Sequence, residues 1–178
     1  MNICVFCGSG SGNDPVFIEA ARELGTHMAK EGHGLVYGGA DIGLMGAIAD
    51  AVLAGGGTVI GIIPSFLFDR EIAHRGISEL IVVGSMHERK KRMAEKADAF
   101  VALPGGWGTL DELAEILTWK QLHLISAPVA ILNTAGYYDH LLAAMKEMVA
   151  KGFLSSDNLT GVQVSASPSE LLASLSRG

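Results

Sequence analysis

The stretch "AFVALPGGWGTLDELAEILTW" (residues 99–119) predicts how this chain is built. An apolar run typical of a buried strand leads through proline and glycine into a segment with the apolar spacing of a helix. A strand followed directly by a helix is the repeating unit of a parallel sheet that is covered by helices. The same order of elements recurs along the rest of the sequence.

Seven apolar runs are candidate strands, and six longer segments are candidate helices. The strands are "NICVF" (2–6), "GLVYG" (34–38), "GTVIGII" (57–63), "ELIVV" (79–83), "AFVAL" (99–103), "PVAILN" (128–133) and "GVQVS" (161–165). The helices cover residues 15–31, 43–55, 86–97, 109–121, 138–150 and a last segment from about 168. Continuous apolar strands are typical of sheets covered on both faces. The fold class predicted is α/β, with a single doubly wound, Rossmann-like nucleotide-binding domain over residues 1–178 and a parallel sheet of about six or seven strands flanked by helices.

Capping signals predict where several helices begin. Asp14 followed by Pro15 suits an N-cap and a first helical residue. "SMHE" (85–88), "TLDE" (109–112) and "SPSE" (167–170) each have the spacing of a capping box, in which a hydroxyl and a carboxylate satisfy the first amides of a helix.

Composition limits the classes of protein that fit. The chain has 178 residues, 49% of them apolar and 18% charged, which favours a compact globular fold over disorder. A formal net charge of −6 disfavours nucleic acid and anionic membranes as partners. The apolar stretches are interrupted well before the roughly 18 residues of a membrane-spanning helix. The start "MNICVFCGSG" does not resemble a secretory signal, so we expect a cytoplasmic protein.

Cys4 and Cys7 form a C-x-x-C, the spacing of a redox pair or of half a zinc site. In a strand, residues three apart point to opposite faces, so the two sulfur atoms should diverge. The six histidines show no paired spacing that would supply the other two zinc ligands. We therefore predict two small core residues and no metal.

Three glycine-rich loops follow predicted strands: "CGSGSGND" (7–14), "YGGADIGLMG" (37–46) and "LPGGWGT" (103–109). The carboxyl ends of parallel strands share one edge of the sheet, where ligands bind near the switch in strand order. Glycine lets a ligand approach backbone N–H groups closely. Each loop alone could be only a tight turn, but three on one edge predict a cleft for an anion or nucleotide. The dinucleotide G-x-G-x-x-G and the G-x-x-x-x-G-K-[ST] P-loop are both missing from the sequence.

The loop "PGGWGT" leads into a helix whose first N–H groups and positive dipole end would hold a phosphate. Thr109 could add its hydroxyl to that site or only cap the helix. Glu112 could close the cap, or it could project toward a sugar attached to the phosphate, accept hydrogen bonds and act as a general base. The basic side chains of "SMHERKKRM" (85–93) could form a solvated helix face, or one arginine among them could place its guanidinium in the same cleft.

With these motifs the sequence resembles the LOG family, the cytokinin riboside 5′-monophosphate phosphoribohydrolases, which older annotation often calls lysine decarboxylases. The family signature P-G-G-x-G-T-x-x-E is matched by residues 104–112 and the M-H-x-R-K element by residues 86–90. The stretches "CVFCGSG", "YGGADIGLMG", "IIPSFL" and "PVAILNTAGYYDHLL" carry the rest of the resemblance, which covers the chain up to about residue 155.

The resemblance implies hydrolysis of the N-glycosidic bond of a nucleoside 5′-monophosphate, AMP or N6-prenylated AMP, to the free base and ribose 5-phosphate. It implies a homodimer without a metal or organic cofactor. The catalytic arginine and glutamate of the family fall on Arg89 and Glu112. The substrate and phosphate contacts expected from the loops and the resemblance are Gly105, Gly106, Gly108, Thr109, Gly8, Ser9, Gly38, Gly39, Lys90, Glu71, Met86 and Thr118.

Two rival functions use the same fold. A non-catalytic carrier of a phosphorylated ligand, such as the molybdenum cofactor carriers, would use the glycine loops but has no need of a carboxylate beside a ribose. A DNA-handling protein is disfavoured because the acidic chain has no broad basic stripe. The sequence leaves the preferred base and the role of Trp107 open.

Overall fold

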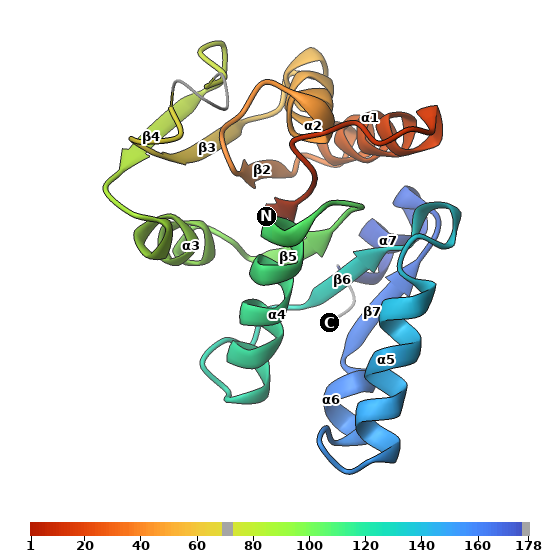
Figure 1. Ribbon diagram of the computed structural model, residues 1–178. Helices are drawn as coiled ribbons and strands as arrows, with labels where there is room; N and C mark the ends of the chain where they lie inside the picture. The colour runs from red at the N-terminus through yellow and green to blue at the C-terminus, as the bar shows by residue number, and fades with distance from the viewer. Residues whose placement is uncertain (69–72, 176–178) are drawn as a thin grey trace.

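The computed structural model describes residues 1–68 and 73–175. Within these residues seven parallel strands form one sheet in the order β4-β3-β2-β1-β5-β6-β7 (Figure 1). The strands are β1 (Asn2–Phe6), β2 (Gly34–Tyr37), β3 (Val59–Pro64), β4 (Glu79–Val83), β5 (Ala99–Ala102), β6 (Val129–Leu132) and β7 (Val162–Ser165). The predicted doubly wound α/β fold is confirmed, and so are all seven predicted strands.

In the part of the chain that the structure describes, a helix follows every strand except β3. The helices are α1 (Pro15–Lys30), α2 (Gly43–Ala54), α3 (Met86–Glu95), α4 (Trp107–Gln121), α5 (Asp139–Ala150), α6 (Ser156–Thr160) and α7 (Pro168–Leu175), with a 3-10 turn η1 (Thr134–Gly136). The six predicted helices are all present. The sequence did not predict α6 and η1, because elements of one turn are too short to show a helical period. Among the described residues, the helices are all too short or too polar to cross a membrane.

The sheet separates two apolar cores. One core holds Ile3, Val5 and Cys7 of the first strand and its extension against α1, α2 and α7. The other holds Cys4 and Phe6 against side chains of α3, α4 and α5. This alternation follows from the two-residue repeat of a strand, and it confirms that Cys4 and Cys7 point to opposite faces. Both thiols are buried and neither forms a disulfide.

Most of the predicted helix starts are confirmed. Asp14 is the N-cap of α1 and accepts a hydrogen bond from the Val16 N–H at 3.0 Å. Ser85 caps α3 by accepting from the Glu88 N–H at 3.1 Å. In the usual capping box the carboxylate accepts from the N–H of the N-cap residue, here Ser85. The Glu88 carboxylate accepts instead from the N–H of Gly84, one residue before the N-cap.

The predicted capping box at Thr109 is wrong. Helix α4 begins two residues earlier, with Gly106 as its N-cap and Trp107 as its first residue. Gly106 has an extended backbone (φ −96°, ψ −148°) and provides no side-chain cap. Thr109 is therefore the third residue inside the helix, and Glu112 lies in its second turn. Capping thus does not account for the carboxylate at 112.

The three glycine loops meet where the strand order switches. Strands β1 and β5 are neighbours, β2 to β4 extend to one side, and β6 and β7 extend to the other. The N–H of Gly8, after β1, donates to the carbonyl oxygen of Pro104, after β5, at 3.0 Å. The N–H of Leu44, after β2, donates to the carbonyl oxygen of Gly8 at 3.1 Å. This crevice is where a ligand is expected in an open parallel sheet.

Candidate active site

A cleft of about 190 Å³ lies at the switch point. Its walls are the end of β1, the residue after β2, and the first turns of α2, α3 and α4. The cleft is lined by Val5, Cys7, Gly8, Ser9, Gly38, Met45, Met86, Arg89, Gly106, Trp107, Gly108, Thr109 and Glu112. Residues from four separate parts of the sequence therefore meet in one place, and three of these parts are the glycine loops or adjoin them.

The amino end of α4 forms one wall of the cleft. Gly106, Trp107 and Gly108 line it, so the first backbone amides of the helix are at the cleft surface. The first four N–H groups of a helix have no partner within the helix and carry its positive dipole end. Gly106 and Gly108 are exposed and carry no side chain that could cover these amides, and the space beside both is open, since a Cβ there would meet no atom within 4 Å. This wall has the features of an anion site.

Glu112 lies on the same face of α4, one turn after Thr109. Residues three apart on a helix are neighbours on its surface, so both side chains face the cleft. Thr109 is 3% exposed and Glu112 is 9% exposed. A carboxylate this buried is rare unless it is paired or functional. The helix therefore presents backbone donors at its first turn and a carboxylate at its second.

Arg89 enters the cleft from the first turns of α3 and is 5% exposed. Its Nε donates to the carbonyl oxygen of Ile62 at 3.1 Å, and its Nη2 donates to the carbonyl oxygen of Gly38 at 2.9 Å. Its Nη1 lies 3.8 Å from the sulfur of Met86. A planar guanidinium held at two of its nitrogens by backbone carbonyls has one orientation. The cation is thus fixed in place before any ligand binds.

The charges of Glu112 and Arg89 both reach the end of β1. Burial raises the pKa of the Cys7 thiol well above its usual value, the nearby Glu112 carboxylate raises this pKa further, and Arg89 lowers it. The same two charges act on the pKa of Cys4, which burial also raises. The opposite charges of Arg89 and Glu112 therefore share one low-dielectric region, the cleft floor.

The structure brings most of the predicted site residues together. Gly8, Ser9, Gly38, Gly106, Gly108, Thr109, Met86, Arg89 and Glu112 all line the cleft. Gly39 and Gly105 do not line the cleft but lie behind the residues that do. Gly39 has a φ of +83° and packs against β3, and Gly105 packs under the Thr109 side chain. These two glycines shape the loops from behind and do not line the cleft.

Two further predicted contacts, Lys90 and Thr118, are not part of this cleft wall. The ammonium group of Lys90 lies 3.1 Å from Asp111 and 3.2 Å from Glu115, so it joins α3 to α4. Thr118 lies near the end of α4, where its hydroxyl donates to the carbonyl oxygen of Ala114 at 2.8 Å, and it lines a different hollow. Glu71 lies outside the described residues.

Sequence reasoning missed the apolar floor of the cleft. Val5 and Met45 line it, and Cys7, which was predicted only as a core residue, lines it as well. The available signal was their position beside glycine loops: Val5 and Cys7 lie at the end of β1, and Met45 lies in the first turn of α2, within the second glycine-rich segment. Tyr137 was not predicted either; its hydroxyl donates to the carbonyl oxygen of Gly105 at 2.6 Å.

The fold and the cleft together define a doubly wound α/β protein with a glycine-lined site at its topological switch point. The chain belongs to the LOG family of cytokinin riboside 5′-monophosphate phosphoribohydrolases. The family model described as "possible lysine decarboxylase" matches residues 45–175. A probable cytokinin riboside 5′-monophosphate phosphoribohydrolase of Oryza sativa subsp. japonica is 51% identical over 155 residues, which are 87% of this chain and 70% of the relative.

Two other similar proteins extend the comparison. A cytokinin riboside 5′-monophosphate phosphoribohydrolase of Arabidopsis thaliana is 51% identical over 153 residues, which are 86% of this chain and 72% of the relative. Among solved structures, the molybdenum cofactor binding protein of Rippkaea orientalis superimposes with a TM-score of 0.73 at 26% identity, covering 97% of this chain and 95% of that one. The family resemblance stated from the motifs is thus confirmed.

Proposed function

We propose that this protein hydrolyses the N-glycosidic bond of a nucleoside 5′-monophosphate, AMP or an N6-prenylated AMP, and releases the free base and ribose 5-phosphate. One observation carries the proposal: a buried arginine and a buried glutamate line the same cleft as the uncovered amino end of α4. The names of relatives at about half identity agree with this reaction.

In this proposal each wall of the cleft binds a different part of the substrate. The 5′-phosphate binds at the amino end of α4, where backbone N–H groups and the helix dipole stabilise an anion. The ribose then extends along α4 toward Glu112, one turn further on. Water attacks the anomeric carbon, the bond from that carbon to the base nitrogen breaks, and its electron pair leaves with the base. The attacking water loses one proton and the base nitrogen gains one, so the products are ribose 5-phosphate and the neutral base.

Glu112 and Arg89 act on the charges of this reaction. As the bond to the base lengthens, positive charge develops on the ribose, and the Glu112 carboxylate stabilises this oxocarbenium-like centre and accepts hydrogen bonds from the ribose hydroxyls. The Arg89 guanidinium stabilises negative charge on the phosphate or on the leaving base. Its two backbone hydrogen bonds fix it before the substrate arrives, so no reorganisation is needed during the reaction.

The carrier alternative is less well supported. The Rippkaea orientalis protein shares the fold, and its name refers to binding the molybdenum cofactor. Its identity to this chain is half that of the phosphoribohydrolase relatives. A carrier also has no use for a buried carboxylate beside the sugar of its ligand, because that negative charge opposes phosphate binding.

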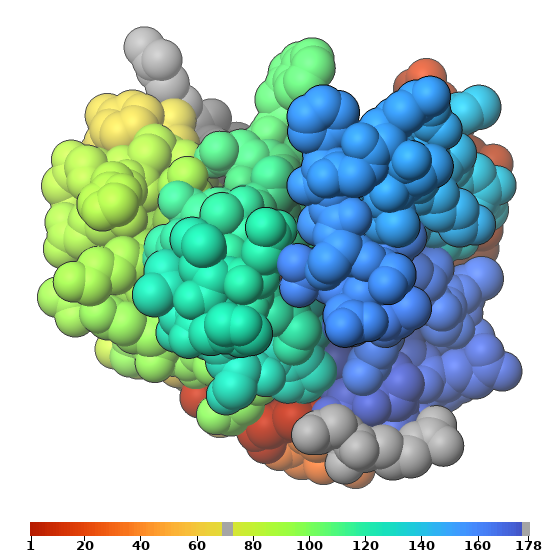
Figure 2. Space-filling model, turned by 90° about the horizontal axis from the view of Figure 1, so that it is seen from below, coloured from red at the N-terminus to blue at the C-terminus, as the bar shows by residue number. Residues whose placement is uncertain are grey.

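We further propose that the chain works as a homodimer. The cleft of about 190 Å³ is smaller than the roughly 300 Å³ at which ligand pockets usually begin, so it fits the phosphoribosyl part better than a whole nucleotide. A larger hollow of about 720 Å³ lies along the other side of α4, between α4, α5 and α6. Figure 2 shows α4 beside α5 and α6 on this face of the molecule.

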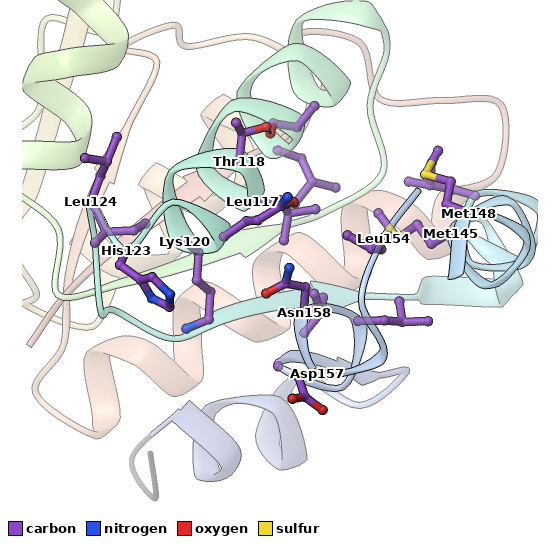
Figure 3. Close-up of a pocket in the computed structure, with 18 of the residues that line it drawn as sticks. Leu117, Thr118, Lys120, His123, Leu124, Met145, Met148, Leu154, Asp157 and Asn158 are labelled. Carbon is purple, nitrogen blue, oxygen red and sulfur yellow. Dashed lines mark hydrogen bonds between the residues drawn. The ribbon is translucent and has the colours of Figure 1, made fainter. Parts of the chain in front are cut away.

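The hollow is lined mainly by large apolar side chains, as subunit interfaces are. Figure 3 shows Leu117 and Thr118 of α4 on one side of it and Met145 and Met148 of α5 on the other. Leu124 on its rim is 67% exposed, and Met148 is 47% exposed. Large exposed apolar surfaces of this kind mark interaction sites. Since α4 borders both the hollow and the cleft, a second copy seated there adjoins the site, and Thr118 lies at the interface.

Product analysis tests the proposed reaction. The purified protein is incubated separately with AMP and with isopentenyl-AMP, and free base and ribose 5-phosphate are followed by chromatography. We expect equal amounts of both products from one or both substrates, and the ratio of rates identifies the preferred base. Dephosphorylation to the nucleoside, or no reaction with either nucleotide, would contradict the proposal.

The cytoplasmic location, the absence of a nucleic-acid or membrane partner and the single nucleotide-binding domain stay predictions from the sequence.

A further inference from the structure

Three consecutive carbonyl groups of the loop between β5 and α4 each accept a hydrogen bond from a group outside the loop. The carbonyl oxygen of Leu103 accepts from the hydroxyl of Tyr138 at 2.6 Å. The carbonyl oxygen of Pro104 accepts from the N–H of Gly8 at 3.0 Å. The carbonyl oxygen of Gly105 accepts from the hydroxyl of Tyr137 at 2.6 Å. Each peptide plane that enters α4 is thus fixed from outside the loop.

Fixing a carbonyl also fixes the next amide. A trans peptide is planar, so the C=O of one residue and the N–H of the next point in opposite directions. The Gly105 carbonyl points at Tyr137, and the N–H of Gly106 therefore points away from Tyr137. Gly106 lines the cleft and is the N-cap of α4, so its N–H belongs to the group of amides that binds the 5′-phosphate in the proposed function.

We propose that Tyr137 is a positioning residue that orients the Gly106 amide toward the phosphate of the substrate. The inference rests on the proposed function and deepens it, because it names a residue outside the cleft wall on which phosphate affinity depends. Glycine on both sides of this peptide gives the backbone wide freedom to rotate. One hydrogen bond from a fixed hydroxyl removes that freedom before the ligand arrives.

The ring of Tyr137 is itself held in place. It packs edge-on against Tyr138, with ring centroids 4.9 Å apart, and edge-on against Phe17 of α1, with centroids 5.7 Å apart. Phe17 in turn fills the space beside Gly12 in the first glycine loop. Tyr137 therefore joins the loops after β1, β5 and β6, and a change in its hydroxyl leaves the ring contacts intact.

Tyr138 provides a matched comparison. It also donates a 2.6 Å hydrogen bond to the loop, and it is 2% exposed whereas Tyr137 is 45% exposed. Burial raises the pKa of the Tyr138 hydroxyl well above its usual value, as do the neighbouring Tyr137 and Cys7, so this hydroxyl keeps its proton. Its acceptor is the carbonyl of Leu103, and the residue after Leu103 is Pro104, which has no N–H. Tyr138 thus supports the loop but orients no anion-binding amide.

The test measures ligand affinity in Tyr137→Phe and Tyr138→Phe by titration calorimetry with ribose 5-phosphate, inorganic phosphate and ribose. In Tyr137→Phe we expect affinity for the two phosphate ligands to fall about two- to tenfold, the effect of one hydrogen bond, with ribose unaffected. In steady-state assays with AMP the same variant should raise KM by a similar factor with little change in kcat. Tyr138→Phe should lose less affinity and more thermal stability, because it leaves a buried carbonyl without a partner.

The possible failures are distinct. If the wild-type protein binds ribose 5-phosphate and Tyr137→Phe binds it equally well, the positioning role is wrong while the proposed function stands. If Tyr138→Phe loses as much phosphate affinity as Tyr137→Phe, general loosening of the loop explains both effects, and the specific role of Tyr137 is wrong. If the wild-type protein binds neither phosphate ligand, the phosphate site of the proposed function is wrong, and the inference falls with it.

Discussion

The Nη2 of Arg89 donates a hydrogen bond to the carbonyl oxygen of Gly38, 2.9 Å away, although 51 residues separate the two in sequence. A Cβ at position 38 would overlap the same Nη2 and lie 3.3 Å from the Cζ of Arg89. Gly38 therefore gives the guanidinium its space as well as a hydrogen-bond acceptor.

Gly38→Ala should reduce activity much more than stability. The added methyl group meets the guanidinium of Arg89 and the sulfur of Met45. Both are ends of side chains, which can move aside once the hydrogen bonds of Arg89 are broken, so the fold is retained. The displaced guanidinium no longer faces the substrate, and kcat/KM should fall about 10²-fold, the effect of a displacement of about 1 Å at a reacting centre. Steady-state kinetics and thermal melting check both expectations.

Gly84→Ala is the control for this substitution. Gly84 lies between β4 and α3, and a Cβ there meets only the Glu88 carboxylate at an ordinary 3.6 Å. We expect near wild-type kinetics. Wild-type kcat/KM in Gly38→Ala would show that the position of Arg89 does not matter for the reaction.

Gly105 and Gly106 should respond to alanine in opposite ways. A Cβ on Gly105 would lie 2.7 Å from the Cβ of Thr109 and 2.9 Å from the N of Gly8, so backbone must shift. Overpacking of this kind costs about 1–3 kcal/mol, which lowers Tm by roughly 2–12 °C in a chain of this size. A Cβ on Gly106 meets nothing within 4 Å, so Gly106→Ala should keep its Tm and instead weaken phosphate binding.

Differential scanning fluorimetry and calorimetric titration with ribose 5-phosphate separate the two effects. The result that contradicts this account is a lower Tm in Gly106→Ala than in Gly105→Ala.

Much of the fold was predictable from the sequence, because covered parallel strands are continuous apolar runs and each is followed by a helix with its own period. The start of α4 was not. "TLDE" (109–112) has the spacing of a capping box, but the glycine at 106 lets the chain turn into the helix earlier, without a side-chain cap. The start of α4 is therefore set by the backbone conformation at Gly106 and not by a side-chain cap at Thr109.

The site was predictable as far as its residues follow strands or occupy a motif. Arg89 and Glu112 fell within recognisable elements, and the structure places both in one cleft. The sequence could not show that the neighbouring Lys90 binds carboxylates of α4, since the contact depends on how two helices cross. Nor could it show that Tyr137 reaches Gly105, which lies 32 residues away.

Lys90 should stabilise the fold at neutral pH and lose this effect in alkali. Partial burial lowers the pKa of its ammonium group, but hydrogen bonds and charge interactions with Asp111 and Glu115 outweigh burial and raise the pKa above its usual value. A raised pKa means that the stabilisation is complete below the usual lysine pKa of about 10.4 and is lost as pH rises through the folded-state value.

Lys90→Met should therefore lower Tm by roughly 2–4 °C at pH 8, for a pair worth about 1 kcal/mol, and the difference should shrink as the pH rises above the usual lysine pKa of about 10.4. Lys91→Met is the control, because the Lys91 side chain is 63% exposed and pairs only loosely with Glu95 at 3.8 Å. A difference that stays constant through that rise in pH would mean that Lys90 acts by packing and not by charge.

The apolar hollow beside α4 should hold a second copy of the chain. Light scattering should give twice the chain mass of 18.6 kDa. Leu124→Glu places a charge on the exposed rim of the hollow and should give monomers, because burying that charge at an interface costs several kcal/mol. Val82→Glu changes a residue of 50% exposure on β4, away from the hollow, and should stay dimeric. A wild-type monomer at micromolar concentration would contradict the proposed dimer.

Glu112→Gln tests the central claim most directly, since it removes the negative charge of the cleft and keeps the shape of the side chain. Asp111→Asn makes the same chemical change one residue earlier, on a side chain that is 59% exposed and bound to Lys90. With saturating AMP or isopentenyl-AMP, whichever is the better substrate, kcat should fall at least about 10²-fold in Glu112→Gln and remain near wild type in Asp111→Asn. Equal rates of base release in Glu112→Gln and the wild-type protein would contradict hydrolysis between Arg89 and Glu112.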